Sequence, residues 1–112
     1  MPVSRVPERG DFIWVEFTHQ AGREQAGRRP AIVLSPRAYN AASGLALLCP
    51  VTSQVKGYPF EVAIPAGSLV KGVVLADQGK SVDWRSRNTK FIAQASKDVI
   101  SEVQAKVRVL VE

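Results

Sequence analysis

Short apolar stretches separated by turn residues occupy most of the chain. Residues 11–17 are rich in aromatic and β-branched side chains and follow Pro7 and Gly10, which is typical of a strand. Further strands are predicted at 30–35, 45–52, 60–64, 72–76 and 78–84. The stretch 45–52 is apolar enough to be buried on both faces, and we expect Pro50 at an edge or a bulge. The spacing predicts antiparallel β structure.

The period of the pattern changes only near the C-terminus. There, apolar residues fall on one face of a helix, at Val99, Ile100, Val103, Val107 and Leu110. Ser96 is a suitable N-cap, and Asp98 in the first turn suits the positive end of the helix dipole. The predicted fold is mainly β (α+β), a small, partly open SH3-like β-barrel of five to seven strands with a C-terminal amphipathic helix.

Two segments between strands are predicted to be irregular. Residues 18–29 contain two glycines and almost no large apolar side chains, so we expect a mobile surface loop that serves as a lid. Residues 36–44 are predicted as a connection. With 112 residues, we expect a single domain over 1–112.

Charge and cysteine content limit the function classes. The net charge of +5 and the pI near 9.8 favour a polyanionic partner, a nucleic acid or an acidic protein, although a solvated positive face is an equal alternative. Cys49 is the single cysteine, which excludes an intrachain disulfide and a multi-cysteine metal site, so we expect it to fill the core. Neither a signal peptide nor a membrane span is recognisable, and a cytoplasmic location is expected.

The strongest candidate for chemistry combines two polar segments beside apolar strands. Glu24 stands five residues before Arg29, directly ahead of one strand, and Thr52 and Ser53 follow another. RNA cleavage without a metal needs a base, a cation for the phosphate oxygens and an acid for the leaving oxygen. Arg29 suits the cation, Glu24 the base, and the two hydroxyls can donate to the phosphate. A solvated ion pair and ordinary turn chemistry explain the same residues.

Other polar positions are weaker candidates. His19 is the single histidine, so a two-histidine mechanism within one chain is excluded, and we expect a surface residue with a general-base role in reserve. Lys56 and Tyr58 combine a cation with an aromatic ring in a short turn, which suits single-stranded nucleic acid as well as a hydrophobic turn anchor. The polar segments 77–81 and 84–90 are either RNA-binding or plain turns.

Four blocks of sequence, in order, resemble one family. They are GDFIWV at 10–15, EQAGRRPAIVLS at 24–35, TSQVKGYPFE at 52–61 and VLADQGKSVDW at 74–84. On these blocks the chain resembles the MazF/PemK toxin endoribonucleases of type II toxin–antitoxin systems, from about Val6 to the C-terminal helix. The resemblance implies an SH3-like barrel that forms a homodimer, with RNA in a groove at the dimer interface. It also implies an antitoxin whose flexible acidic tail covers that groove.

The resemblance further implies the reaction and its residues. The reaction is cleavage of single-stranded mRNA without metal or cofactor, leaving a 2′,3′-cyclic phosphate and a 5′-hydroxyl. Arg29 matches the catalytic arginine of the family and Thr52 its phosphate-binding threonine. Glu24 also stands at a family position, whose role as base is not settled across members. RNA contacts are implied for Glu16, Phe17, Gln25, Arg28, Gln54, Lys56, Leu75 and Gln78, and Ser53 is added as a phosphate donor.

Two alternatives remain at this point. Toxins with the same barrel inhibit DNA gyrase through protein contacts, but those relatives lack the arrangement of Arg29 and Thr52. A non-catalytic RNA-binding module would hold RNA intact in a basic groove. The sequence leaves the preferred bases, the identity of the antitoxin and cleavage of rRNA or tRNA open.

Overall fold

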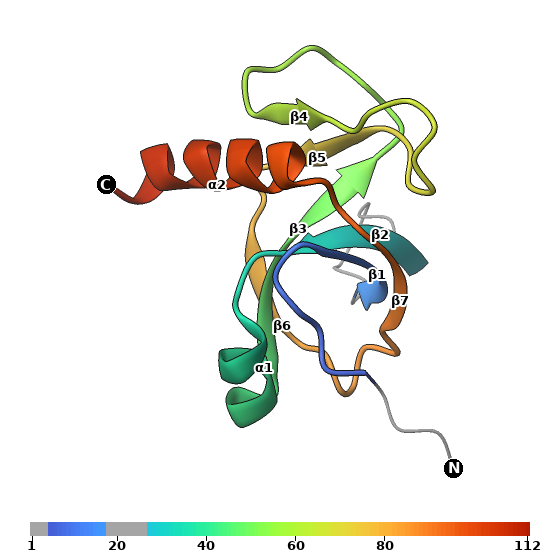
Figure 1. The fold of residues 1–112 in the computed structure, drawn as a ribbon, viewed down its shortest axis with the longest axis vertical. Helices are drawn as coiled ribbons and strands as arrows, with labels where there is room; N and C mark the ends of the chain where they lie inside the picture. Colours follow the sequence, from blue (N-terminus) through green and yellow to red (C-terminus); the bar gives the residue numbers. More distant parts are fainter. Residues whose placement is uncertain (1–4, 18–26) are drawn as a thin grey trace, which may run out of the picture.

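A strongly bent antiparallel sheet forms the body of the protein in a computed structural model that describes residues 5–17 and 27–112. Within these residues the strands are β1 Asp11–Phe17, β2 Gly27–Val33, β3 Leu45–Thr52, β4 Glu61–Ala63, β5 Val73–Leu75, β6 Lys80–Asp83 and β7 Lys90–Gln94. Their order is β4-β5-β3-β2-β1-β7, and β6 pairs with β3. Figure 1 shows β1, β2, β3, β6 and β7 curling around a common interior. The partly open barrel predicted from the sequence is confirmed.

Strand β3 links two parts of the sheet because its partner changes along its length. Its first half pairs with β6, and its end pairs with β5, which continues to β4. Two apolar cores result, one on each side of the sheet. The barrel interior holds Ile13, Val15, Ala31, Val33, Ala46, Leu48, Val82 and Trp84. The other core includes Phe12, Ile32, Cys49, Val51, Val62, Val74, Val99 and Val103, and therefore joins the sheet to the C-terminal helix.

Helix α2, Lys97–Val111, crosses above the barrel beside β4 and β5 (Figure 1). The predicted N-cap is confirmed, since the Ser96 hydroxyl accepts the backbone N–H of Val99 at 3.3 Å. Val99 and Val103 are buried, as the helical pattern predicts. The prediction for Leu110 is wrong, because half of its surface is exposed where the last turns extend beyond the sheet.

Several predicted boundaries need correction. Residues 37–43 form helix α1, Arg37–Ser43, which Gly44 ends in the left-handed conformation, whereas an irregular connection was expected. Strand β2 begins at Gly27 rather than at Pro30, so the end of the expected lid is strand; residues 18–26 lie outside the described residues. Strand β7 was missed because it is short and none of its five residues is fully buried, so its three apolar residues were not recognised as a strand.

Strand β3 also differs from expectation in two respects. Leu45 and Leu47 are more than a third exposed, so the first half of the strand is buried on one face rather than two. Pro50 lies inside the sheet, opposite Ala31, and not at an edge. On its other side, pairing to β6 ends at Leu48 and pairing to β5 starts at Val51, so a missing N–H is tolerated there.

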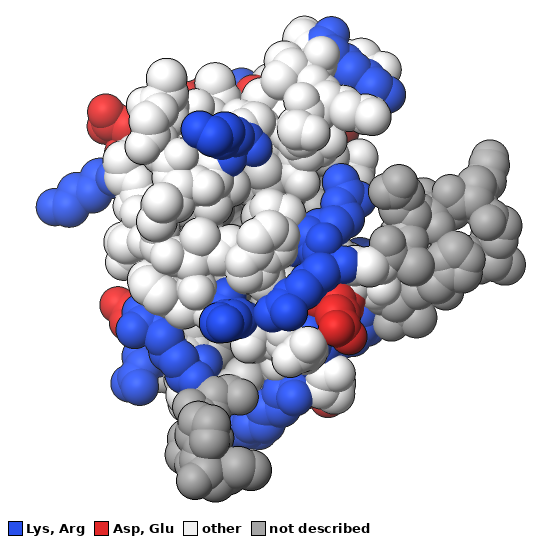
Figure 2. Space-filling view, turned by 90° about the vertical axis from the view of Figure 1, so that its right-hand side faces the viewer, with Lys and Arg blue, Asp and Glu red and all other residues white. Residues whose placement is uncertain are grey.

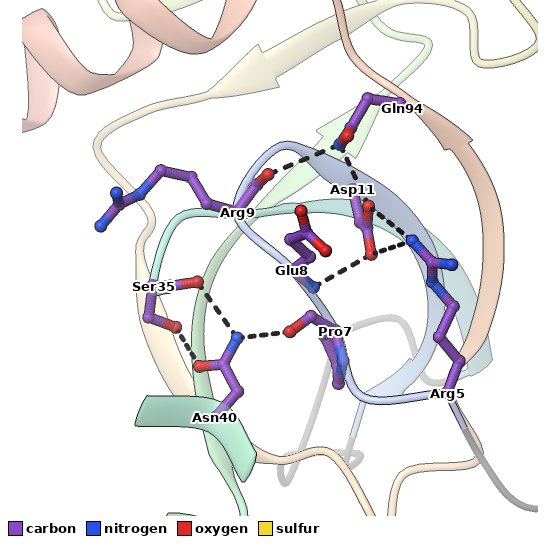
Figure 3. Close-up of polar contacts among 8 residues, drawn as sticks. All are labelled: Arg5, Pro7, Glu8, Arg9, Asp11, Ser35, Asn40 and Gln94. Atoms are coloured by element: carbon purple, nitrogen blue, oxygen red, sulfur yellow. Dashed lines mark hydrogen bonds and ion pairs between the residues drawn. The ribbon is translucent and has the colours of Figure 1, made fainter. Parts of the chain in front are cut away.

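A buried polar hub, formed by Asp11, Ser35, Asn40 and their partners, fastens the N-terminal segment to the barrel (Figure 3). The Asn40 amide donates to the carbonyls of Pro7 at 2.8 Å and Ser35 at 3.1 Å, and its oxygen accepts the Ser35 hydroxyl at 2.6 Å. The Asp11 carboxylate accepts the Glu8 backbone N–H and the Gln94 amide at 3.0 and 3.1 Å. Arg5 pairs with it at 3.4 Å.

Among the described residues, no helix combines the length and apolar character that crossing a membrane requires.

Candidate functional site

The strand register brings Arg29 and Thr52 to one place. Strands β2 and β3 pair antiparallel, with Ala31 opposite Pro50 and Ile32 opposite Cys49. Continuing this register toward the strand ends places Arg29 opposite Thr52. Both residues line a cavity of about 730 Å³ at this end of the sheet. A guanidinium and a hydroxyl that are 23 positions apart in the sequence therefore face one volume.

Gly72 allows strand β5 to complete the cavity. It has φ +114°, and a Cβ atom there would overlap the carbonyl oxygen of Thr52. The β5 backbone can therefore lie directly against the end of β3, where Thr52 pairs with Val73. This pairing brings Leu75 and Gln78, which follow along the chain, to the cavity wall.

The lining groups suit an anionic substrate with a planar base. Arg29, Lys56 and Lys71 contribute positive charge, and Arg29 is half-buried in β2. The Thr52 hydroxyl accepts the backbone N–H of Gln54 at 3.1 Å, which leaves its own hydrogen free to donate to a ligand. Tyr58 is 59% exposed and presents a ring against which a base can stack. The site can thus bind a phosphodiester and an adjacent nucleotide.

Most of the predicted site residues that the structure describes lie together. The cavity brings together Arg29, Thr52, Ser53, Gln54, Lys56, Leu75 and Gln78. Glu61, Lys71 and Asp77 also line the cavity. No role was predicted for Glu61 or Lys71, and Asp77 was predicted only as part of a polar segment that is either RNA-binding or a plain turn. The position of Glu61 inside an alternating strand segment gave no signal, because its neighbours in space come from a loop.

Three predicted RNA-binding residues lie outside the cavity lining. Glu16 accepts the side-chain amide of Asn88 at 3.0 Å, and Arg28 donates to the Asn88 carbonyl at 3.3 Å. The ring of Phe17 packs against the barrel core, with the Lys80 ammonium 5.5 Å from its centroid. Their RNA contacts stay predictions. The candidates Glu24, Gln25 and His19 lie outside the described residues.

The described residues hold no cluster of three or more His, Cys, Asp or Glu side chains that could bind a metal ion. Cys49 is buried behind the cavity wall, as the prediction of a core position required. Burial, with a smaller contribution from the negative charge of Asp77, raises the pKa of its thiol to about 11. The thiol is therefore protonated at neutral pH and is a poor nucleophile.

The surface charge fits the same interpretation. Figure 2 shows one side of the molecule, where Lys and Arg side chains are widely spread and few Asp or Glu side chains are seen. With a net charge of +5, the protein attracts polyanions over distances comparable to the Debye length.

Comparisons with known proteins identify relatives of this chain. Residues 8–111 match the family of the PemK-like, MazF-like toxin of type II toxin-antitoxin system. The endoribonuclease toxin MazF of Escherichia coli (strain K12) is 48% identical over 110 residues, covering 97% of this chain and 98% of the relative. The endoribonuclease toxin ChpB of the same strain is 35% identical over 111 residues, covering 94% of each. A crystal structure of MazE-MazF from Deinococcus radiodurans matches with a TM-score of 0.89 and 56% identity, covering 96% of this chain and 97% of that chain.

Proposed function

Because the chain belongs to the family of PemK-like, MazF-like toxins of type II toxin-antitoxin systems, we propose that it is a sequence-specific endoribonuclease of the cytoplasm. Its substrate is single-stranded mRNA, and it cleaves without a metal ion or cofactor. The chain matches two endoribonuclease toxins over nearly their whole length, which supports this activity. The observation that carries the mechanism is that Arg29 and Thr52 line one cavity.

The reaction that these groups support is an internal transesterification. The 2′-oxygen forms a bond to phosphorus, the bond from phosphorus to the 5′-oxygen breaks, and the products are a 2′,3′-cyclic phosphate and a 5′-hydroxyl. Arg29 stabilises the charge that develops on the non-bridging oxygens, and Thr52 and Ser53 donate hydrogen bonds to them. Glu24 is proposed to take the proton of the 2′-hydroxyl. An acid then protonates the leaving 5′-oxygen.

The remaining contacts hold the RNA on either side of that phosphate. Gln54, Lys56, Leu75 and Gln78 are proposed to contact it within the cavity, and Lys56 supplies charge. Glu16, Phe17, Gln25 and Arg28 are proposed to extend the binding surface toward β1 and β2. Stacking and amide contacts of this kind need bases that are not paired with another strand. The proposed substrate is therefore single-stranded.

The proposal includes two protein partners. One is a second copy of the chain, with the RNA groove at the dimer interface. The other is a cognate antitoxin with an acidic flexible tail, which the positive charge of the protein would attract. The MazE-MazF structure supports a partner of this class.

Cleavage of a long unstructured RNA in the presence of EDTA tests the proposal. The wild-type protein should produce fragments with 5′-hydroxyl ends, and Arg29→Ala should lower kcat/KM by about 100- to 1,000-fold, because one charge-stabilising group is lost. Arg37→Ala is the matched control, since Arg37 is an exposed cation of α1 outside the cavity lining. Equal cutting by wild type and Arg29→Ala would overturn the assignment. Bound but intact RNA would indicate a binding module, and inhibited supercoiling in a parallel assay would indicate a gyrase inhibitor.

A further inference from the structure

One wall of the cavity is an irregular segment to which a carboxylate is hydrogen-bonded. We call residues 53–60, between β3 and β4, the rim loop; it carries Lys56 and Tyr58 into the cavity lining. The Glu61 carboxylate accepts the backbone N–H of Lys56 at 3.0 Å through one oxygen and that of Gly57 at 2.9 Å through the other. Both oxygens of Glu61 therefore bind the rim loop, although the residue itself lines the cavity.

Helix α2 holds the same loop from the other side. The Lys106 ammonium donates to the Pro59 carbonyl at 2.7 Å. The next carbonyl, that of Phe60, accepts the backbone N–H of Ala76 at 3.0 Å. Since Ala76 lies between Leu75 and Gln78, this bond ties the end of the rim loop to the neighbouring segment, which also lines the cavity.

Few other contacts fix the rim loop. The Thr52 hydroxyl accepts the backbone N–H of Gln54 and the Tyr58 carbonyl accepts that of Glu61, both at 3.1 Å, and Phe60 at the end of the loop packs against the core. Residues 53–59 are all exposed and take no part in the pairing of the sheet. Ordering a loop residue costs about 1–2 kcal/mol of backbone entropy, so an exposed segment without packing samples many conformations unless specific bonds hold it. Hydrogen bonds to a charged group are the stronger kind and suit this task.

The held conformation directs two groups toward the same nucleotide. The Lys56 ammonium lies 6.0 Å from the centroid of the Tyr58 ring. A nucleotide whose base stacks on that ring would place its phosphate within reach of the ammonium. Both groups line the cavity that contains Arg29 and Thr52, so this nucleotide would be a neighbour of the cleaved one.

We propose that Glu61 and Lys106 are positioning residues, which hold the rim loop so that Lys56 and Tyr58 bind a nucleotide flanking the scissile phosphate of single-stranded RNA. The inference rests on the proposed function, because it concerns the same cavity. Glu61 acts through the backbone of the rim loop, and Lys106 links that loop to helix α2.

Steady-state cleavage of a single-stranded RNA that extends on both sides of the cut site tests the inference. We expect Glu61→Gln to raise KM about tenfold and to leave kcat within about twofold, because the amide retains one acceptor and the flanking nucleotide is lost from binding. The substitution removes one negative charge, which by itself would favour RNA. Glu102→Gln removes an equal charge from an exposed site of α2 and should leave KM unchanged or slightly lower.

Lys106→Met provides a second route to the same loop. We expect KM to rise by about fivefold, with Lys97→Met as the control that removes an equal charge from an exposed position of the same helix. Thermal melts of all four variants establish that the protein is folded. Unchanged KM in both Glu61→Gln and Lys106→Met would overturn the proposal.

A double-mutant comparison separates positioning from a general structural role. If Glu61 acts through the rim loop, adding Glu61→Gln to a Lys56→Met/Tyr58→Ala protein should change KM by less than about twofold. An undiminished tenfold effect in that background would contradict the proposal. Binding of a DNA strand of the same sequence, which lacks the attacking hydroxyl, gives a second readout. If the wild type fails to cut RNA but Glu61→Gln still weakens this binding, the proposed function fails and the role of the rim loop stands.

Discussion

The buried hub and the cavity are both built from polar side chains, but they use them in opposite ways. In the hub, Asp11 and Asn40 are fully buried and bind to protein groups on several sides (Figure 3). In the cavity, Thr52 and Lys56 are partly or fully exposed, and the Thr52 hydroxyl keeps its hydrogen free. Within the described residues, every buried side-chain nitrogen or oxygen has a hydrogen-bond partner.

From this difference we expect the hub to act on stability and the cavity to act on the proposed function. A buried polar group that loses its partner costs about 1–3 kcal/mol, so substitutions in the hub should act on the free energy of unfolding. Removing an exposed group that has no protein partner changes the stability of the free protein little. A bound ligand, however, loses its hydrogen-bond partner. Substitutions in the cavity should therefore act on cleavage. The following predictions test this contrast.

The largest effect on stability is expected for Asn40→Ala. It removes the amide that bridges Pro7 and Ser35 and leaves two carbonyls and a hydroxyl without that partner. The free energy of unfolding should fall by about 3 kcal/mol, measured by denaturant titration. Arg29→Ala in the same experiment should change it by less than about 0.5 kcal/mol. A comparable loss of unfolding free energy in both variants would contradict the contrast between hub and cavity. A lower cleavage rate per folded molecule of Asn40→Ala would contradict it as well.

An intermediate effect, on activity, is expected for Thr52→Val. The substitution removes the hydroxyl and keeps the branched shape, so a donor to the phosphate is lost at nearly constant volume. We expect kcat/KM to fall by about tenfold, corresponding to one hydrogen bond to a charged group, with little change in the melting temperature. The measurement is cleavage of the same RNA under EDTA. An unchanged rate would show that the hydroxyl does not contact the reacting phosphate.

The smallest effect, and one that depends on pH, is expected for Asp11→Asn. Both carboxylate oxygens accept hydrogen bonds. In the variant, the NH₂ group of the amide faces one of these donors, which should lower the free energy of unfolding by about 1 kcal/mol. Burial raises the pKa of Asp11 above its ordinary value of 3.8, against the opposing effects of the Glu8 N–H and of Arg5.

The sign of the pH dependence follows from that raised pKa. The folded protein holds the proton of Asp11 to higher pH than the unfolded chain does, so the contribution of this carboxyl is complete below the unfolded pKa and decreases as pH rises through the folded pKa. The difference in unfolding free energy between wild type and Asp11→Asn should therefore narrow as the pH rises from the ordinary value of 3.8 through the raised pKa of the folded protein. Denaturant titrations at several pH values measure it, and a difference that widens with pH would contradict the shift.

Much of the fold and part of the site could be predicted from local pattern. Strands β1 and β3 match their predicted bounds, because aromatic and β-branched runs have few alternatives to a strand. Strand β7 could not be predicted in this way, since its apolar run is only three residues long and forms a strand by pairing with the edge of β1. Helix α1 was missed because Tyr39 and Asn40 in a short segment after a proline resemble a turn.

The sequence by itself determined which groups the candidate site has: its cation, its hydroxyls and the basic charge of the protein, and the strand ends at which these groups lie. Only the tertiary structure decided what those groups face. The pairing of β2 with β3 brings Arg29 and Thr52 to one cavity, and Glu61 and Lys106 bind the rim loop, the latter across 47 positions of the chain. The physical reason is that hydrophobic alternation is a local property of the chain, whereas a hydrogen-bond partner is defined by position in space.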